Sequence, residues 1–240
     1  MIAFKNVDFF RSSIDALASF IPEGNFRFNE KGVQFRAMDP SQVLLVDYSM
    51  DRSVFSQYEV EPCFVGMNID ELRKIVSRAQ PGDHIELELT DSECVISLKG
   101  ELERSFRLPL IDIADEEIKL PEIKYDSHVE INAKVLKEAL KDAQLFSSSV
   151  VIRTKGDKFM LESKGTGGNL AVNSSPNNGV KVKSKADVVS KYSLSYLHNI
   201  VKEAAPEAPI VLELKSDLPL KVSYQIGKTE IRYYLAHMLL

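Results

Sequence analysis

Cysteine is scarce in this chain, and its scarcity excludes two classes of protein. Only two cysteines, Cys63 and Cys94, occur among 240 residues. They are too few and too far apart for a disulfide framework or for the paired spacing of a zinc site. We expect both to be reduced thiols that pack as small buried apolar side chains.

A basic excess is also missing. The 35 aspartates and glutamates outnumber the 30 lysines and arginines, which gives a formal net charge of −5. Proteins that coat nucleic acid usually carry a clear basic excess. Any contact with DNA must therefore be confined to one face, while the remaining acidic surface repels phosphate. Such a charge balance suits a protein that stays on DNA by its shape rather than by strong attraction.

Long apolar runs are absent as well. No stretch approaches the roughly 20 apolar residues that span a bilayer, and no basic start followed by an apolar run indicates a signal peptide. We expect a soluble intracellular protein without membrane contact. With 44% apolar and 27% charged residues, the chain can bury a sizeable core in one large or two modest domains.

No pattern typical of catalysis or metal binding appears. The four histidines lack metal-ligand spacing, and the glycine-rich segment at 164–169 lacks the pattern of a phosphate-binding loop, so we interpret it as a turn. The serines at 147–149 have no nucleophile-elbow setting. The carboxylates at 112–117 fall in a connector, where they solvate the chain rather than form an acid and base pair. We expect no enzyme activity, no metal and no cofactor.

The chain instead contains an internal repeat, which bears directly on the fold. The segment at 68–79 aligns with 193–204 at a constant shift of 125 residues and keeps one apolar helix face. The same shift continues without a gap to residues 106–107, and the earlier parts of the two halves also align after a one-residue change. Chance similarity is the alternative, but one shift would then have to serve helix, turn and strand together.

Each half is predicted to be a similar α+β unit with two helices and several antiparallel strands. Apolar residues recur at helical spacing in four segments, at 8–21, 69–79, 133–146 and 193–204. Asn68 and Asn132 stand where helix N-caps belong, and prolines near 81 and 206–209 are expected to end the second and fourth helices. Most of the remaining sequence alternates apolar and polar residues, as strands do, so sheets with helices on one face are expected.

The segment at 111–125 separates the two halves. It is acidic at its centre, contains Pro121 and has neither helical nor strand periodicity, so we interpret it as an extended connector. We predict a first domain at residues 1–116, the end of the connector at 117–125 and a second domain at 126–240.

Three segments carry a family resemblance: GVQFRAMDPSQVLLVDYSM at 32–50, LPEIKY at 120–125 and DLPLKVSYQIGKTEIRYYLAHM at 217–238. They resemble the corresponding segments of the proliferating cell nuclear antigen family, the archaeal and eukaryotic sliding clamps, and the resemblance covers the whole chain. It implies a homotrimer closed head to tail into a pseudo-sixfold ring, with sheets outside and helices lining the hole. The implied function is a DNA sliding clamp, a processivity factor that encircles duplex DNA and tethers replication and repair enzymes.

The resemblance also implies how subunits join. By family position, the strand at 103–109 pairs with the neighbour's strand at 169–174. The expected interface side chains are Phe106, Leu108, Leu170 and Val172. Pairing of edge strands between subunits removes exposed edges and allows a ring to close. Packing of Phe106 and Leu108 inside their own domain is the alternative.

Contact with double-stranded DNA is expected from the polar helix faces. Basic residues that match family positions or lie beside them are Arg11, Arg73, Lys74, Arg78, Lys134, Lys137, Lys141 and Lys202. Such cations meet phosphates without reading bases, so binding should be weak, salt-sensitive and independent of sequence. For any single residue, a solvated helix face without a partner is the alternative.

A second site implied by the resemblance captures short partner peptides, the PIP-box type, whose glutamine, aliphatic and aromatic residues bind beside the connector. Matching positions are Met38, Gln42, Val43, Leu45, Ile118, Leu120, Pro121, Asp217, Pro219, Tyr234, Leu235 and Ala236. Ordinary core packing is the alternative for each apolar member. The implied partners are DNA polymerase, the clamp loader, flap endonuclease and DNA ligase.

Two features depart from the family pattern. His237 stands where the family usually has proline, and the chain ends in apolar Met238, Leu239 and Leu240 instead of an acidic tail. A specialised subunit of a heterotrimeric or checkpoint-type clamp is therefore the alternative function. If the source is archaeal, the expected location is the cytoplasm or nucleoid.

Overall fold

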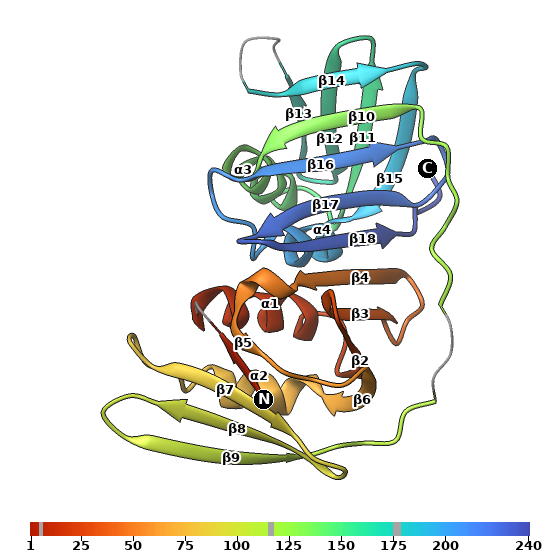
Figure 1. The fold of residues 1–240 in the computed structure, drawn as a ribbon. Helices are drawn as coiled ribbons and strands as arrows, with labels where there is room; N and C mark the ends of the chain where they lie inside the picture. Colours follow the sequence, from red (N-terminus) through yellow and green to blue (C-terminus); the bar gives the residue numbers. More distant parts are fainter. Residues whose placement is uncertain (5–6, 115–117, 175–178) are drawn as a thin grey trace. The chain divides into compact units, whose positions relative to one another are not determined.

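The computed structural model describes residues 1–4, 7–114, 118–174 and 179–240 (Figure 1). Its contacts divide the chain into two compact units. The first unit comprises Met1–Lys119 with Ile226–Ile231, and the second comprises Leu120–Gln225 with Arg232–Leu240. The predicted acidic centre of the connector, at 115–117, lies outside the described residues.

The first unit contains two α-helices, a short 3-10 turn and nine strands. In chain order they are β1 (Ile2–Phe4), α1 (Val7–Ala18), β2 (Glu23–Asn29), β3 (Gly32–Met38), β4 (Leu44–Asp51), η1 (Arg52–Val54), β5 (Phe55–Tyr58), β6 (Cys63–Asn68), α2 (Ile69–Val76), β7 (His84–Leu89), β8 (Glu93–Lys99) and β9 (Glu103–Pro109). One sheet has the strand order β5-β1-β7-β8-β9, and the other strands follow the order β4-β3-β2-β6. The pairs within these two sets are antiparallel.

The second unit repeats this inventory. Its elements are β10 (Ser127–Asn132), α3 (Ala133–Gln144), β11 (Ser149–Lys155), β12 (Lys158–Gly165), β13 (Gly168–Asn173), β14 (Lys181–Ser184), β15 (Val188–Ser193), α4 (Leu194–Val201), β16 (Pro209–Leu214), β17 (Leu220–Ile226) and β18 (Thr229–Leu235). The strand orders are β14-β10-β16-β17-β18 and β13-β12-β11-β15. The second-unit orders equal those of the first unit when each strand is replaced by its counterpart in the repeat.

The predicted repeat is thus confirmed element by element. Helices α1 and α3 begin and end 126 residues apart, and α2 and α4 begin and end 125 residues apart. The shift changes between β5 and β6, because the loop after β14 is one residue shorter than the loop after β5. The predicted α+β fold, two similar units with two helices each, is therefore confirmed.

The helices begin where their caps predict. The side chain of Asn68 accepts a hydrogen bond from the backbone N–H of Glu71 at 2.9 Å, and Asn132 accepts one from Lys134 at 2.9 Å. Both bonds satisfy backbone donors that the first helical turn leaves unpaired. The N-caps expected from the sequence are therefore confirmed.

The ends of α2 and α4 were predicted too late. They end at Val76 and Val201, several residues before the prolines expected to terminate them. After Val76 the chain tightens into i to i+3 hydrogen bonds, from Arg78 N–H to Ile75 O at 3.0 Å and from Ala79 N–H to Val76 O at 3.1 Å. Such tight turns satisfy the last carbonyls without extending the α-helix.

Each unit has its own apolar core. The helices of a unit pack side by side, α1 with α2 and α3 with α4. Phe10, Ile14 and Leu17 of α1 are buried, as are their counterparts Leu136, Leu140 and Ala143 of α3. The periodicity that predicted these helices therefore also identified their buried faces.

The two cysteines differ in their surroundings. Cys94 is fully buried in β8, as expected, and burial raises the pKa of its thiol to about 12. Cys63 is exposed, so the expectation that both cysteines are buried is wrong. The physical reason is position, because Cys63 opens β6, which is the last strand in its order and lacks a neighbouring strand on one side.

The loop between β3 and β4 depends on one buried carboxylate. Asp39 is only 4% exposed, and its side chain accepts hydrogen bonds from the backbone N–H groups of Ser41, Val43 and Leu44 at 3.2, 2.7 and 2.6 Å. Gln42 in the same loop adopts a positive φ of 57°. The carboxylate therefore holds a backbone conformation that the loop would not favour by itself.

Replacing this carboxylate should destabilise the protein strongly. We expect Asp39→Ala to lower the free energy of unfolding by about 3 kcal/mol, because it leaves backbone donors without an acceptor in a buried site. Urea unfolding followed by circular dichroism measures the effect. Asp51→Ala is the matched control, since Asp51 is exposed and accepts a bond from Ser53 N–H alone among these donors, and it should change stability little. Equal effects of the two substitutions would contradict the assignment.

Candidate DNA-facing helices and partner surfaces

Arg11, the expected phosphate contact of α1, is engaged within the first unit. Its guanidinium donates a hydrogen bond to the carbonyl of Ala79, just beyond α2, at 2.5 Å. An ion pair with Asp8 at 3.7 Å is its second contact. Because a cation near the C-terminal carbonyls of a helix is favourable, this bond fixes α1 against the end of α2.

Lys137 makes the equivalent bond in the second unit. Its ammonium group donates to the carbonyls of Ala204 at 2.6 Å and Lys202 at 2.8 Å, beyond the end of α4. Lys137 is the repeat counterpart of Arg11, and Ala204 is the counterpart of Ala79. Burial lowers the pKa of Lys137. Both cations thus join the first helix of their unit to the second, a structural role that the sequence did not reveal.

The other expected cations are more available. Lys74 pairs with Glu71 at 2.6 Å and Lys141 with Glu138 at 2.7 Å, while Lys202 lies 3.8 Å from Glu203. Exposed pairs of this kind contribute at most about 1 kcal/mol, so a phosphate can replace the carboxylate at little cost.

Three further cations have no ion pair within the described residues. They are Arg73, Arg78 and Lys134, and all three are exposed. Sequence differences make the helices unequal, since α1 carries Asp8 and Asp15 where α3 carries Lys134 and Lys141. The basic character of the helix faces therefore comes mainly from α2 and α3.

The two strands expected at the subunit interface are both sheet edges. β9 ends the order β5-β1-β7-β8-β9, and β13 ends the order β13-β12-β11-β15. Phe106, Leu170 and Val172 are half-buried, but Leu108 is only 5% exposed. The side chain of Leu108 therefore packs inside its own unit, which was the alternative considered for it, and only its backbone lies on the edge.

The first unit contributes one set of the expected peptide-binding residues. Met38, at the end of β3, is 39% exposed, whereas Leu45 is 4% exposed and belongs to the core. The connector is attached here by Arg36, which donates to the carbonyl of Ile118 at 3.0 Å and pairs with Asp47 at 2.9 Å. The other expected residues of this unit are exposed Gln42 and half-buried Val43.

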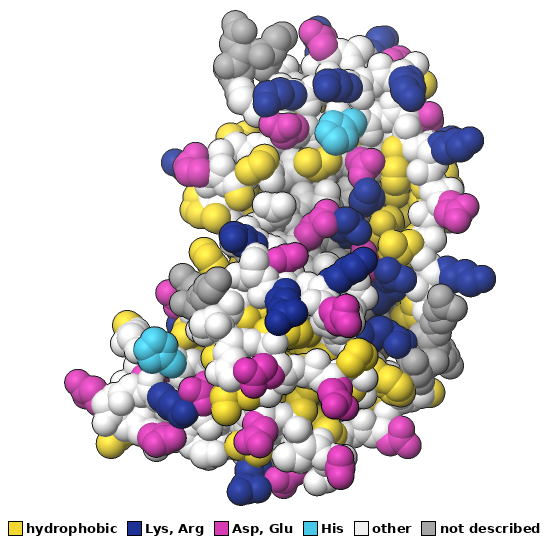
Figure 2. Space-filling model, in the orientation of Figure 1, with side chains coloured by type: hydrophobic (Ala, Val, Ile, Leu, Met, Phe, Trp, Pro, Cys, Tyr) yellow, Lys and Arg dark blue, Asp and Glu magenta, His cyan; other side chains and the backbone are white. Residues whose placement is uncertain are grey.

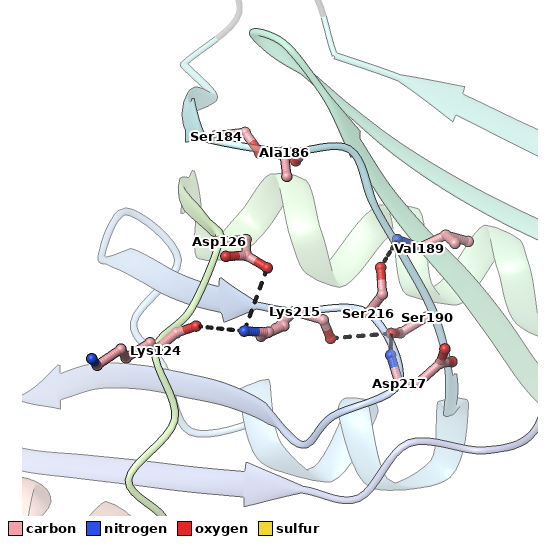
Figure 3. Close-up of polar contacts among 9 residues, drawn as sticks. All are labelled: Lys124, Asp126, Ser184, Ala186, Val189, Ser190, Lys215, Ser216 and Asp217. Atoms are coloured by element: carbon pink, nitrogen blue, oxygen red, sulfur yellow. Dashed lines mark hydrogen bonds and ion pairs between the residues drawn. The ribbon is translucent and has the colours of Figure 1, made fainter.

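The second unit contributes the other set. Asp217 adopts a positive φ of 54° and donates its backbone N–H to Ser190 Oγ at 2.9 Å. Lys215 reaches the end of the connector, lying 3.8 Å from the carboxylate of Asp126 and 3.4 Å from the carbonyl of Lys124 (Figure 3). These bonds fix the loop before β17 to the connector.

The remaining expected residues of the second unit differ in exposure. Tyr234 and Leu235 of β18 are 8% and 0% exposed, so Leu235 is a core residue. Leu120, Pro219 and Ala236 are half-buried, and Pro121 is exposed.

Sequence reasoning missed two residues of this region. Lys215 attaches the connector as described above. Tyr125 is half-buried, its hydroxyl has no hydrogen-bond partner within the described residues, and burial raises its pKa. Its position at the end of LPEIKY was the available signal for Tyr125. No comparable signal marks Lys215, because its contact is made with residues about 90 positions earlier.

Two searches of the described ranges gave no hits. No helix among them has the length and apolarity needed to cross a bilayer. In the same ranges, no group of three or more histidine, cysteine, aspartate or glutamate side chains is arranged to hold a metal ion.

Relatives of known function share the length and sequence of this chain. It is 34% identical over 229 residues to the DNA polymerase sliding clamp of Thermococcus gammatolerans, covering 94% of this chain and 92% of that protein. It is 30% identical over 234 residues to the DNA polymerase sliding clamp of Methanococcus vannielii, with 95% and 94% covered.

Solved structures share the fold. A crystal structure of PCNA from Thermococcus kodakaraensis superposes with a TM-score of 0.94 at 27% identity and covers 99% of both chains. The proliferating cellular nuclear antigen of Entamoeba histolytica gives a TM-score of 0.90 at 22% identity, covering 99% of this chain and 98% of that one, a likeness of fold alone.

Family models account for nearly the whole sequence. The model of the N-terminal domain of proliferating cell nuclear antigen matches residues 2–129, and the model of the C-terminal domain matches residues 119–238. The repeated sheets, the relatives and these matches agree. The chain therefore belongs to the proliferating cell nuclear antigen family.

Proposed function

We propose that this protein is a DNA sliding clamp that encircles duplex DNA as a ring of three copies and tethers DNA polymerase. The observation that carries the proposal is the duplicated unit, whose edge strands β9 and β13 each pair with a strand on one side only. Similarity over nearly the whole chain to archaeal DNA polymerase sliding clamps supports it.

Edge pairing explains how such a ring closes. β9 and β13 have free backbone donors and acceptors, and exposed edges of this kind are normally paired or covered. A head-to-tail contact between different surfaces forms a ring when its rotation closes. Half-buried Phe106 and Leu170 gain further burial if β9 pairs with the β13 of a neighbour.

A charge placed on this edge should open the ring. Light scattering should give about three times the 27.0 kDa chain mass for the unaltered protein, and Phe106→Asp should shift it toward the monomer because a buried unpaired charge is costly. Ser105→Asp is the matched control, since exposed Ser105 alternates with Phe106 along β9. An unaltered protein that stays monomeric at all concentrations, or a trimeric Phe106→Asp variant, would contradict the assigned interface.

The DNA-facing surface is proposed to consist of the exposed helix cations, above all Arg73, Lys74, Lys134 and Lys141. Arg11 and Lys137 are secondary, because each is hydrogen-bonded to the end of another helix. Few free cations on a chain of net charge −5 give weak attraction. We infer that topological enclosure contributes more to retention than attraction does.

Removing helix cations should weaken DNA contact without loss of stability. In polymerase extension assays with loaded clamp, Lys134→Ala with Lys141→Ala should shorten the products and reduce the slope of log K against log salt by about 2, roughly one for each lost phosphate contact. Lys158→Ala and Lys183→Ala together form the control, since both lysines are exposed on strands. Equal loss in both doubly substituted proteins would indicate a general charge effect and contradict the assigned face.

Enclosure itself has a direct test. Loaded protein should remain on closed circular DNA through a high-salt wash and leave the same DNA after one cut makes it linear, because a ring slides off a free end. Gel filtration of the DNA-bound fraction measures retention. Equal retention on the two forms would mean that attraction, not topology, holds the protein.

The peptide pocket is proposed to include Met38, Gln42 and Ile118 of the first unit and Asp217, Pro219 and Tyr234 of the second. Its support is the family resemblance together with the rigid loops that position exposed Met38 and Asp217. The clamp loader, flap endonuclease and DNA ligase are proposed partners through PIP-box peptides. Three pockets on one ring would hold several enzymes at high local concentration near DNA.

The exposed position Met38 gives the clean test of this pocket. Met38→Ala should weaken binding of a PIP-box peptide about tenfold in calorimetry, the effect of removing one apolar anchor. Gln34→Ala, an exposed residue on the same face of β3, should leave the affinity unchanged. Leu45→Ala is less suitable, because Leu45 is a core residue. Unchanged peptide affinity in Met38→Ala would remove Met38 from the pocket.

A further inference from the structure

A surface groove of about 450 Å³ opens in the first unit beside the N-terminus. Its volume lies in the range of sites that hold small ligands or a few side chains. Apolar residues contributed by β1, β6, β7 and the segment after β9 form its floor; they are Ile2, Val65, Leu87, Leu89 and Leu110. Exposed Glu59, Glu61 and Asp91 stand at its rim.

Backbone hydrogen bonds hold the walls in place. Met1 and Glu59 exchange two bonds, from the terminal amine to Glu59 O at 2.6 Å and from Glu59 N–H to Met1 O at 2.9 Å. On the opposite wall, Thr90 N–H donates to Glu93 O at 2.9 Å and Leu110 N–H donates to Ser92 O at 2.8 Å. A ligand would therefore meet a preformed surface, with little entropy lost in ordering it.

The equivalent place in the second unit is closed by polar side chains (Figure 3). There Ser216 Oγ accepts from Val189 N–H at 3.1 Å, and Ser190 Oγ accepts from Asp217 N–H at 2.9 Å and donates to Lys215 O at 3.4 Å. These bonds join β15 to the turn before β17.

The first unit lacks the side chains that make this closure. Counterparts of Ser190 and Ser216 at the same shift of 125 are Val65, which cannot hydrogen-bond, and Asp91. Within the described residues, no hydrogen bond joins β6 to the turn at 90–92. The groove is therefore a difference between two units of the same fold, not a consequence of the fold.

The charge around the groove selects the ligand. The carboxylates of Glu59, Glu61 and Asp91 form no ion pair within the described residues. Residues 1–119 contain 22 acidic and 13 basic residues, whereas residues 120–240 contain 13 acidic and 17 basic residues. Figure 2 shows acidic side chains bordering hydrophobic ones over the first unit. A ligand with both cationic and apolar groups complements this surface.

We propose that this groove docks a short extended segment of a partner protein in which an aliphatic side chain is flanked by lysine or arginine. The aliphatic side chain covers the apolar floor, and the flanking cations pair with Glu59, Glu61 and Asp91. The site lies wholly in the first unit and is separate from the PIP-box residues. A partner can therefore occupy it while a PIP-box peptide is bound.

The test uses the full-length protein and a defined probe. The probe is a fluorescein-labelled peptide with a Leu-Ile pair flanked on both sides by lysines, and fluorescence anisotropy measures its binding. Binding should be lost when glutamate replaces the lysines or glycine replaces the Leu-Ile pair. Glu59→Lys with Glu61→Lys should weaken binding about tenfold or more, because like charges then face each other across the contact. Leu89→Trp, which fills the groove, should weaken it similarly.

Matched controls separate docking from general attraction. Glu88→Lys with Glu101→Lys makes the same charge change at exposed residues that do not line the groove, and it should leave probe affinity unchanged. Equal weakening by this variant, or no binding of the probe, would overturn the proposal. So would binding of the probe only to larger assemblies of this chain. A PIP-box peptide should bind all correctly folded variants equally, so failure of the pocket and failure of the groove are distinguishable.

Discussion

Backbone hydrogen-bonding groups on the free edges of β9 and β13 impose the constraint on which the proposed assembly depends. A sheet edge cannot satisfy its own donors and acceptors, and an uncovered edge promotes uncontrolled association. Duplication provides the chain with one edge of each kind, β9 on a five-stranded set and β13 on a four-stranded set. Pairing them in a closed ring satisfies both edges and leaves no end at which further copies can add.

Charge follows from what such a ring must do. A protein held on DNA by enclosure needs only enough positive charge to tolerate phosphate, because strong attraction would slow sliding. The two best-placed cations in the repeat, Arg11 and Lys137, are bonded to the ends of α2 and α4. They stabilise the helix pair first, and exposed lysines and arginines on α2 and α3 supply the phosphate contacts.

The two units show how one fold can carry different surfaces. Their strand orders agree, yet Ser190 and Ser216 close the second unit where Val65 and Asp91 leave the first unit open. A few side chains at a turn decide this difference, because no strand has to move. Surface chemistry therefore diverges more readily than topology within a repeat, and the acidic groove is a property of the first unit alone.

The sequence by itself determined the repeat, the four helices, the N-caps at Asn68 and Asn132 and the family. These features depend on residues close in the chain or on a constant shift, so periodicity and capping reveal them. Tertiary structure alone decided that Cys63 is exposed, that Leu45 and Leu108 are buried, and that Arg11 and Lys137 bind helix ends. Each outcome depends on which element packs against a residue from far along the chain, and local sequence patterns do not contain that information.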